Sequence, residues 1–99
     1  MAEATLMVKN RLGLHARAAA KVVAIASCLD ASIRIGQGSR QVDGRNIMAL
    51  LTLGAAQGSE LRVQTDGPDA EQALAALQQL FDRHFDEDQF TPDAEQPTE

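Results

Sequence analysis

"EATLMVKNRLGLHARAAAKVV", residues 3–23, changes its pattern of apolar residues part-way along and thereby decides the fold. Apolar and polar side chains alternate in its first eight residues, which predicts a half-buried strand with Ala4, Leu6 and Val8 on the inner face. From Ala16 to about Ser27 apolar residues recur at the i, i+3, i+4, i+7 spacing, which predicts a helix with one buried face. The stripe on that face consists of Ala19, Val22, Val23 and Ala26.

Short strands and a short helix follow. "SIRIG" (32–36) and "RQVD" (40–43) flank the turn residues "GQGS" and predict a hairpin, while "ELRVQT" (60–65) predicts a fourth strand. Between them "IMALLTL" is apolar on nearly every side, with Asn46 suited to cap its beginning and Gly54 its end. This segment is predicted to be a helix with more apolar surface than so short an element can bury.

A long helix is predicted within residues 66–85, with Pro68 at its first position and acidic residues in its first turn. Its buried stripe consists of Ala70, Ala73, Leu74, Leu77 and Phe81. The order β-α-β-β-α-β-α predicts an α+β fold, an open-faced β-sandwich in which a four-stranded antiparallel sheet carries three helices on one face. We expect one domain over residues 1–89 and a disordered acidic tail over residues 90–99.

Composition excludes several classes of function. A net charge of −5 and three aromatic residues, all Phe, argue against a nucleic-acid binder, which would need a basic face and stacking rings. The single cysteine, Cys28, allows no internal disulfide or cysteine-pair zinc site, and we expect it to be a small buried hydrophobe. The polar first residues and the lack of a long apolar run predict a cytoplasmic protein without a membrane partner.

His15 is the candidate reactive residue, because it lies where the first loop becomes the first helix. The first amides of a helix have no intrahelical acceptor and carry partial positive charge, so an anion held on His15 would be stabilised by the backbone of Ala16 and Arg17. The Arg17 guanidinium adds donors suited to phosphate oxygens, and Gly13 allows a tight turn. These residues fit a histidine that accepts a phosphoryl group as a nucleophile and releases it again. The alternative is an exposed histidine or one that only caps the helix.

Two other groups of residues are candidates for lesser roles. Ile47, Met48 and Leu51 belong to the short helix, and they are either core residues or an apolar surface for a protein partner. His84, near the end of the long helix, has no acid or nucleophile fixed beside it by the sequence, and we interpret it as a surface or structural residue.

"GLHARAAAKVV" (13–23) resembles the active-site stretch of the HPr family, the histidine-containing phosphocarriers of the bacterial phosphoenolpyruvate-dependent phosphotransferase system. "VDGRNIMALLTLGAAQGSELRV" (42–63) is similar to the family's second helix and following strand, so the resemblance runs from about Thr5 to Phe85. It implies that His15 is phosphorylated through Nδ1 and that Arg17 stabilises the phosphate. It also implies an Enzyme I-type donor and a IIA-type acceptor, without a cofactor or a metal.

Within the family the resemblance is closest to the nitrogen-related branch, NPr. Members of that branch tend to end in a helix followed by an acidic stretch, here "FDRHFDED" (81–88), and Ala18 stands where sugar-system members usually have proline. Asn46 stands where many members have a regulatory serine, so that switch is expected to be absent. The resemblance also implies that Ala20 and the short helix frame His15 as a docking surface on a monomeric carrier. Two alternatives are a sugar-uptake carrier and a non-catalytic regulatory binding module with the same fold.

Overall fold

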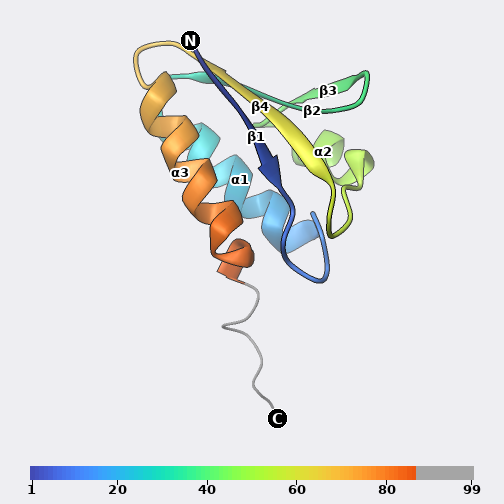
Figure 1. Cartoon of the computed structure of the whole chain (residues 1–99). Helices are drawn as coiled ribbons and strands as arrows, with labels where there is room; N and C mark the ends of the chain where they lie inside the picture. Colours follow the sequence, from blue (N-terminus) through green and yellow to red (C-terminus); the bar gives the residue numbers. More distant parts are fainter. Residues whose placement is uncertain (87–99) are drawn as a thin grey trace.

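The computed structural model describes residues 1–86 and contains four strands and three helices in the predicted order (Figure 1). The elements are β1 (Ala2–Met7), α1 (Ala16–Cys28), β2 (Ser32–Gln37), β3 (Arg40–Asp43), α2 (Ile47–Leu53), β4 (Glu60–Asp66) and α3 (Ala70–Asp82). The predicted tail, residues 90–99, and the last three residues of the predicted domain lie outside the described residues. No helix of residues 1–86 is long and apolar enough to cross a membrane.

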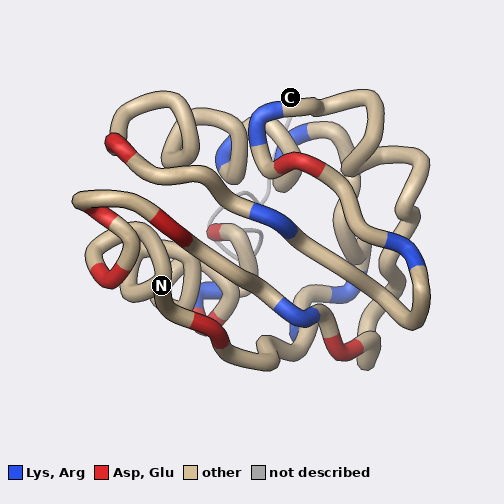
Figure 2. The backbone as a smooth tube through the Cα atoms, turned by 90° about the horizontal axis from the view of Figure 1, so that it is seen from above, with Lys and Arg blue, Asp and Glu red and all other residues tan. Residues whose placement is uncertain are grey.

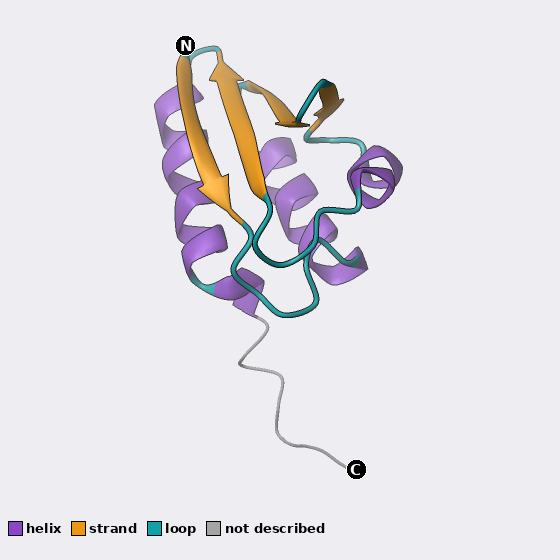
Figure 3. Cartoon of the chain, turned by 45° about the vertical axis from the view of Figure 1, so that its right-hand side comes forward, coloured by secondary structure: helices purple, strands orange, loops and turns teal. Residues whose placement is uncertain are grey.

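The strands form one antiparallel sheet in the order β1-β4-β2-β3 (Figure 3). Val63 at the middle of β4 pairs with Ala4 of β1 on one side and with Ile35 of β2 on the other. These residues point to the face that the helices cover, because alternate side chains of a strand lie on opposite faces of its sheet. The α+β open-faced sandwich is therefore confirmed.

The core lies between this face of the sheet and the stripes of the two long helices. In α1 the buried residues are Ala18, Ala19, Val22 and Ala26, and in α3 they are Ala70, Ala73, Leu77, Leu80 and Phe81. Val23 and Leu74, which were predicted as stripe residues, are half-buried at the edges of the core. Helix α1 contacts both α2 and α3, while α3 lies against β1 and β4.

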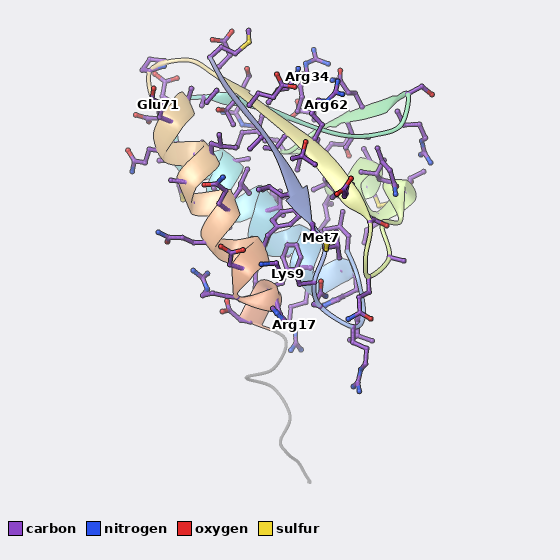
Figure 4. The ribbon with its side chains drawn as sticks, in the orientation of Figure 1. Met7, Lys9, Arg17, Arg34, Arg62 and Glu71 are labelled. Atoms are coloured by element: carbon purple, nitrogen blue, oxygen red, sulfur yellow. The ribbon has the colours of Figure 1, made fainter. Side chains whose placement is uncertain are left out.

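The opposite face of the sheet is open and polar. Acidic and basic residues are interspersed along its strands (Figure 2), and Arg34 and Arg62 extend from it (Figure 4). Glu3 of β1 lies 3.5 Å from the Arg62 guanidinium of β4 and accepts a hydrogen bond from the Gln64 amide (3.4 Å). Cross-strand pairs of opposite charge stabilise a sheet modestly, and they leave this face well solvated.

Two predictions about local structure are wrong. Pro68 is not in the first turn of α3, because the helix begins at Ala70 with Asp69 as its N-cap. The Asp69 carboxylate instead accepts a hydrogen bond from the Asp30 backbone N–H (2.7 Å), which holds residues 67–69 in a turn against the end of α1. Cys28 is exposed, because as the last residue of α1 it lies about 200° around the helix from buried Ala26.

Residues 84–86, the last that the structure describes, form a left-handed turn that connects α3 to α1. His84, Phe85 and Asp86 all have positive φ (58°, 54° and 61°), a conformation that costs non-glycine residues about 1–2 kcal/mol each. Burial of the Phe85 ring against Phe81, with centroids 4.7 Å apart, offsets part of this cost. The Asp86 carboxylate lies 3.3 Å from Lys21 Nζ on α1 and thereby joins the two helices.

The electrostatic environment of Asp86 favours its charged form. Its side chain is 17% exposed and accepts a hydrogen bond from Arg83 Nε at 2.9 Å. The hydrogen bond to Arg83 is the main cause that lowers the pKa of Asp86 below its ordinary 3.8, and the Lys21 ammonium acts in the same direction against the opposing effect of burial.

We expect Asp86→Asn to lower the melting temperature at neutral pH. Because the folded-state pKa of Asp86 lies below 3.8, its contribution to stability is complete above that value and is lost as the pH falls through the folded-state pKa. The difference in melting temperature between the two proteins should therefore disappear in acid, as measured by circular dichroism. Asp82→Asn is the matched control, since Asp82 pairs with Lys9 at 2.8 Å while 69% exposed and should contribute little. A pH-independent effect of Asp86→Asn would contradict the assignment.

Candidate functional site

His15 is the N-cap of α1, and its side chain faces the first amides of that helix. Its backbone is extended (φ −83°, ψ −179°), and its carbonyl accepts the hydrogen bond from Ala19 N–H (2.8 Å). The ring atom Nδ1 accepts a hydrogen bond from Arg17 N–H at 3.2 Å. The capping role that the sequence left as an alternative is therefore real, and it places Nδ1 at the positive end of the helix.

Gly13 lets the loop before His15 approach the segment that follows α2. Leu14 N–H donates a hydrogen bond to the Ala55 carbonyl at 2.8 Å. Gly13 has φ 71°, and a Cβ atom added there would lie 2.5 Å from the Ala55 oxygen. A side chain at this position would therefore force the loop and the segment apart. The predicted role of Gly13 in a tight turn is confirmed by this positive φ and by the close contact.

The side chain of Asn10 takes part in this loop, and the sequence analysis did not identify it. Asn10 is fully buried, and its Nδ2 donates a hydrogen bond to the Gly13 carbonyl at 2.7 Å. The same carbonyl accepts the His15 backbone N–H at 2.9 Å. An asparagine three residues before a glycine is a signal for a turn held by a side-chain amide, and that signal could have drawn attention to Asn10.

Charge and exposure at this end of the molecule suit an anion. The first turn of α1 contains no acidic residue, and Arg17 is exposed where α1 begins, at the end of the molecule where α3 ends (Figure 4). The His15 ring is half-buried, and its Nε2 atom has less than 1 Å² of exposed area. A group bound to Nδ1 lies beside the helix amides and within the field of the helix dipole.

Apolar residues on α1, on α2 and in the loop before α1 are exposed. Met48 is 68% exposed and Ile47 37%, Leu51 is half-buried, and Ala20 is exposed on α1. Leu12, which the sequence analysis did not single out, is 63% exposed in the loop before His15. The helices α1 and α2 that carry these side chains are in contact.

The predicted caps of α2 are both confirmed. Asn46 accepts a hydrogen bond from Ala49 N–H through its side-chain oxygen (3.1 Å). Gly54 ends the helix in the left-handed conformation (φ 60°). His84 lies in the left-handed turn after α3 and is half-buried, which agrees with a structural role. Over residues 1–86 no group of three or more His, Cys, Asp or Glu side chains could hold a metal ion.

The family described as "PTS HPr component phosphorylation site" matches residues 2–83 of the chain. The chain belongs to the HPr family. The phosphocarrier protein HPr of Xylella fastidiosa is 42% identical over 88 residues, which cover 89% of this chain and 99% of that protein. HPr of Pseudomonas aeruginosa is 42% identical over 83 residues, covering 83% and 92%. The crystal structure of HPr from Thermoanaerobacter tengcongensis superposes with a TM-score of 0.84 at 37% identity, covering 88% and 98%.

Membership of the HPr family identifies the chain as a phosphocarrier of the phosphotransferase system. HPr proteins accept phosphoryl groups from Enzyme I and pass them to IIA proteins. The fold that periodicity predicted is the fold of the solved relatives.

Proposed function

We propose that His15 accepts the phosphoryl group on Nδ1 from an Enzyme I-type donor and passes it to a IIA-type acceptor. The observation that carries this proposal is the 3.2 Å hydrogen bond from Arg17 N–H to His15 Nδ1. It places the Nδ1 lone pair at the beginning of α1, where the backbone amides of Ala16 and Arg17 have no intrahelical acceptor. A nucleophile held there has its anion-stabilising groups already in position.

The chemistry follows from the protonation of the ring. Because Nδ1 accepts a hydrogen bond, the neutral ring carries its proton on Nε2 and has a lone pair on Nδ1. The Nδ1–P bond forms as the bond from phosphorus to the donor's leaving atom breaks, and the proton stays on Nε2. The resulting positive ring next to a phosphoryl dianion is a good leaving group, so the same bond breaks readily when an acceptor attacks phosphorus.

The helix start and Arg17 stabilise the phosphoryl oxygens in both directions of transfer. Arg17 N–H, which is bonded to Nδ1 in the unmodified protein, can donate to a phosphoryl oxygen once that lone pair is used. The exposed guanidinium of Arg17 adds a permanent charge with two parallel donors. The backbone N–H and the guanidinium of Arg17 thus both stabilise the phosphoryl oxygens.

The proposed docking surface consists of Ala20, Ile47, Met48 and Leu51. Exposed apolar side chains next to a charged centre are typical of protein interfaces, where they exclude water from the reacting groups. A methionine suits a carrier that must dock with both a donor and an acceptor, because its unbranched side chain adapts to different partners.

We assign the carrier to the nitrogen-related branch, in which the acceptor is a regulatory IIA-type protein. Three features of the sequence support this: Ala18 in place of the usual proline, Asn46 in place of the regulatory serine, and the acidic residues 81–88. Asn46 caps α2 through its amide and has no hydroxyl to phosphorylate. The similar proteins are named simply HPr, so a carrier for sugar uptake is the competing function.

Incubation with phosphoenolpyruvate and an Enzyme I-type donor should add one phosphoryl group to the wild-type chain and none to His15→Ala. His84→Ala is the matched control, since it removes the other histidine and should leave labelling intact. The label should be acid-labile, because protonation makes the imidazole a better leaving group. Intact-mass measurement reads each result, and equal labelling of wild type and His15→Ala would place the phosphate elsewhere. A folded wild type without any label would favour the regulatory binding module.

Arg17→Ala should slow phosphoryl transfer on the order of 10- to 1,000-fold, the scale for loss of one electrostatic donor at a reacting group. Arg17→Lys should restore only part of the rate, because lysine keeps the charge and lacks the planar pair of donors. Stopped-flow transfer rates would measure both, with circular dichroism to confirm folding. Transfer at the wild-type rate in Arg17→Ala would remove the guanidinium from the mechanism.

The phosphorylated carrier should transfer its group faster to a regulatory, nitrogen-related IIA protein than to a sugar-specific one. A competition assay with both acceptors at equal concentration measures this preference. We expect the preference to come from a difference in docking affinity, because the chemistry at His15 is the same for both acceptors. A clear preference for the sugar-specific acceptor would overturn the branch assignment and leave the phosphocarrier intact.

A further inference from the structure

Asn10 is one of only two polar residues buried within residues 1–86, and the other is Thr65. Burial of an amide is unfavourable unless the group is hydrogen-bonded, so a fully buried asparagine indicates a specific contact. That contact is the 2.7 Å hydrogen bond from Asn10 Nδ2 to the Gly13 carbonyl.

The Gly13 carbonyl links Asn10 to the reactive histidine. This carbonyl accepts two hydrogen bonds, one from Asn10 Nδ2 and one from the His15 backbone N–H at 2.9 Å. The N–H of the same peptide group is held as well, because Leu14 N–H donates to the Ala55 carbonyl at 2.8 Å, and the His15 N–H belongs to the peptide group that follows. Two successive peptide planes before His15 are therefore held by hydrogen bonds, and Asn10 supplies the one contact among these that comes from a side chain.

The orientation of the Gly13 peptide decides how His15 enters α1. Gly13 has left-handed φ (71°) and lacks a Cβ, so its own conformational preferences are weak. Without the Asn10 amide, the Gly13–Leu14 peptide would be held at its N–H by the Ala55 carbonyl and at its oxygen only by His15 N–H, so it could tilt about the Ala55 contact and shift the His15 backbone. The ring would then move relative to Arg17 N–H, which lies 3.2 Å from Nδ1.

We propose that Asn10 is a positioning residue for phosphoryl transfer, which holds His15 Nδ1 at the start of α1 through the Gly13 carbonyl. This rests on the proposed function of His15. Asn10 does not touch the phosphoryl group in this scheme, and it acts by keeping the nucleophile aligned for attack. Misplacement of a reacting group by about 1 Å can cost a factor of about 100 in rate.

Thr65 offers a matched control at the other end of the sheet. It is 1% exposed, and its hydroxyl donates to the Ala70 carbonyl at 2.7 Å, so it too makes a buried bond from side chain to backbone. Thr65 pairs with Ala2 at the beginning of β1, whereas the His15 loop follows the end of β1 (Figure 1). Thr65→Val and Asn10→Leu both remove a buried donor with little change in side-chain volume.

The experiment compares wild type, Asn10→Leu and Thr65→Val in three measurements: melting temperature, steady-state phosphorylation by an Enzyme I-type donor with phosphoenolpyruvate, and NMR of the His15 ring and the Arg17 amide. Both variants should melt roughly 5–15 °C lower, from the loss of one buried hydrogen bond. Only Asn10→Leu should reduce kcat, by about 10- to 100-fold, with KM for the carrier unchanged. Only Asn10→Leu should shift the His15 ring and Arg17 amide resonances.

If Asn10→Leu does not fold, Asn10→Ala takes its place in the test. The smaller alanine side chain leaves room for water to bind the Gly13 carbonyl, so this variant removes the amide without burying an apolar group against that oxygen. Met48→Asp gives the contrasting pattern, a raised KM with kcat little changed, because it alters the proposed docking surface. A wild-type kcat in folded Asn10 variants would overturn the positioning role, and so would equal losses of kcat in the Asn10 and Thr65 variants. If wild type is not labelled on His15, the proposed function fails. The Asn10 proposal is tested independently of labelling by NMR: unchanged His15 ring and Arg17 amide resonances in the folded Asn10 variants would overturn it.

Discussion

The contact between the loop of His15 and the segment after α2 is the constraint on which the site depends. The hydrogen bond from Leu14 N–H to the Ala55 carbonyl joins the beginning of α1 to the end of α2, and only glycine fits beside it at position 13. At the opposite ends of these helices, the Arg45 guanidinium donates to two backbone carbonyls at and just beyond the end of α1, each at 3.2 Å. The two helices around the site are thus held at both ends by hydrogen bonds that cross between them.

In the proposed function, the residue that caps α1 is also the reactive group. In the unmodified protein the Nδ1 lone pair of His15 satisfies an orphan amide at the start of α1, as a capping side chain does. A phosphoryl group on Nδ1 would replace that acceptor with negatively charged oxygen atoms, which the same amide and the helix dipole favour. The same backbone amide could thus serve both acceptors. Such an exchange of acceptors suits a protein that is phosphorylated and dephosphorylated repeatedly.

The architecture confines this chemistry to one end of the molecule. One face of the sheet is covered by the helices, and the other carries interspersed charges that pair across strands, such as Glu3 with Arg62. The end where α1 begins is different, because it combines helix amides without partners in the helix, the exposed Arg17 and exposed apolar side chains. The Lys21–Asp86 ion pair fastens α3 to α1 one helical turn beyond Arg17, so this end is also firmly packed.

The sequence by itself determined the order of the elements, the fold class and the capping position of His15, because hydrophobic period and cap chemistry are local properties of the chain. Tertiary contacts decided where α3 begins and whether Cys28 is buried, which the local pattern of the sequence predicted wrongly. The bond between Asp69 and Asp30 moved the start of α3 past Pro68, and the extension of α1 by one residue turned Cys28 toward solvent. The spacing of Asn10 and Gly13 is visible in the sequence, whereas the burial of Asn10 appears only in the folded chain. The loop that contains Asn10 and His15 closes against Ala55, a residue about forty positions further along the chain, and no local spacing rule predicts that contact.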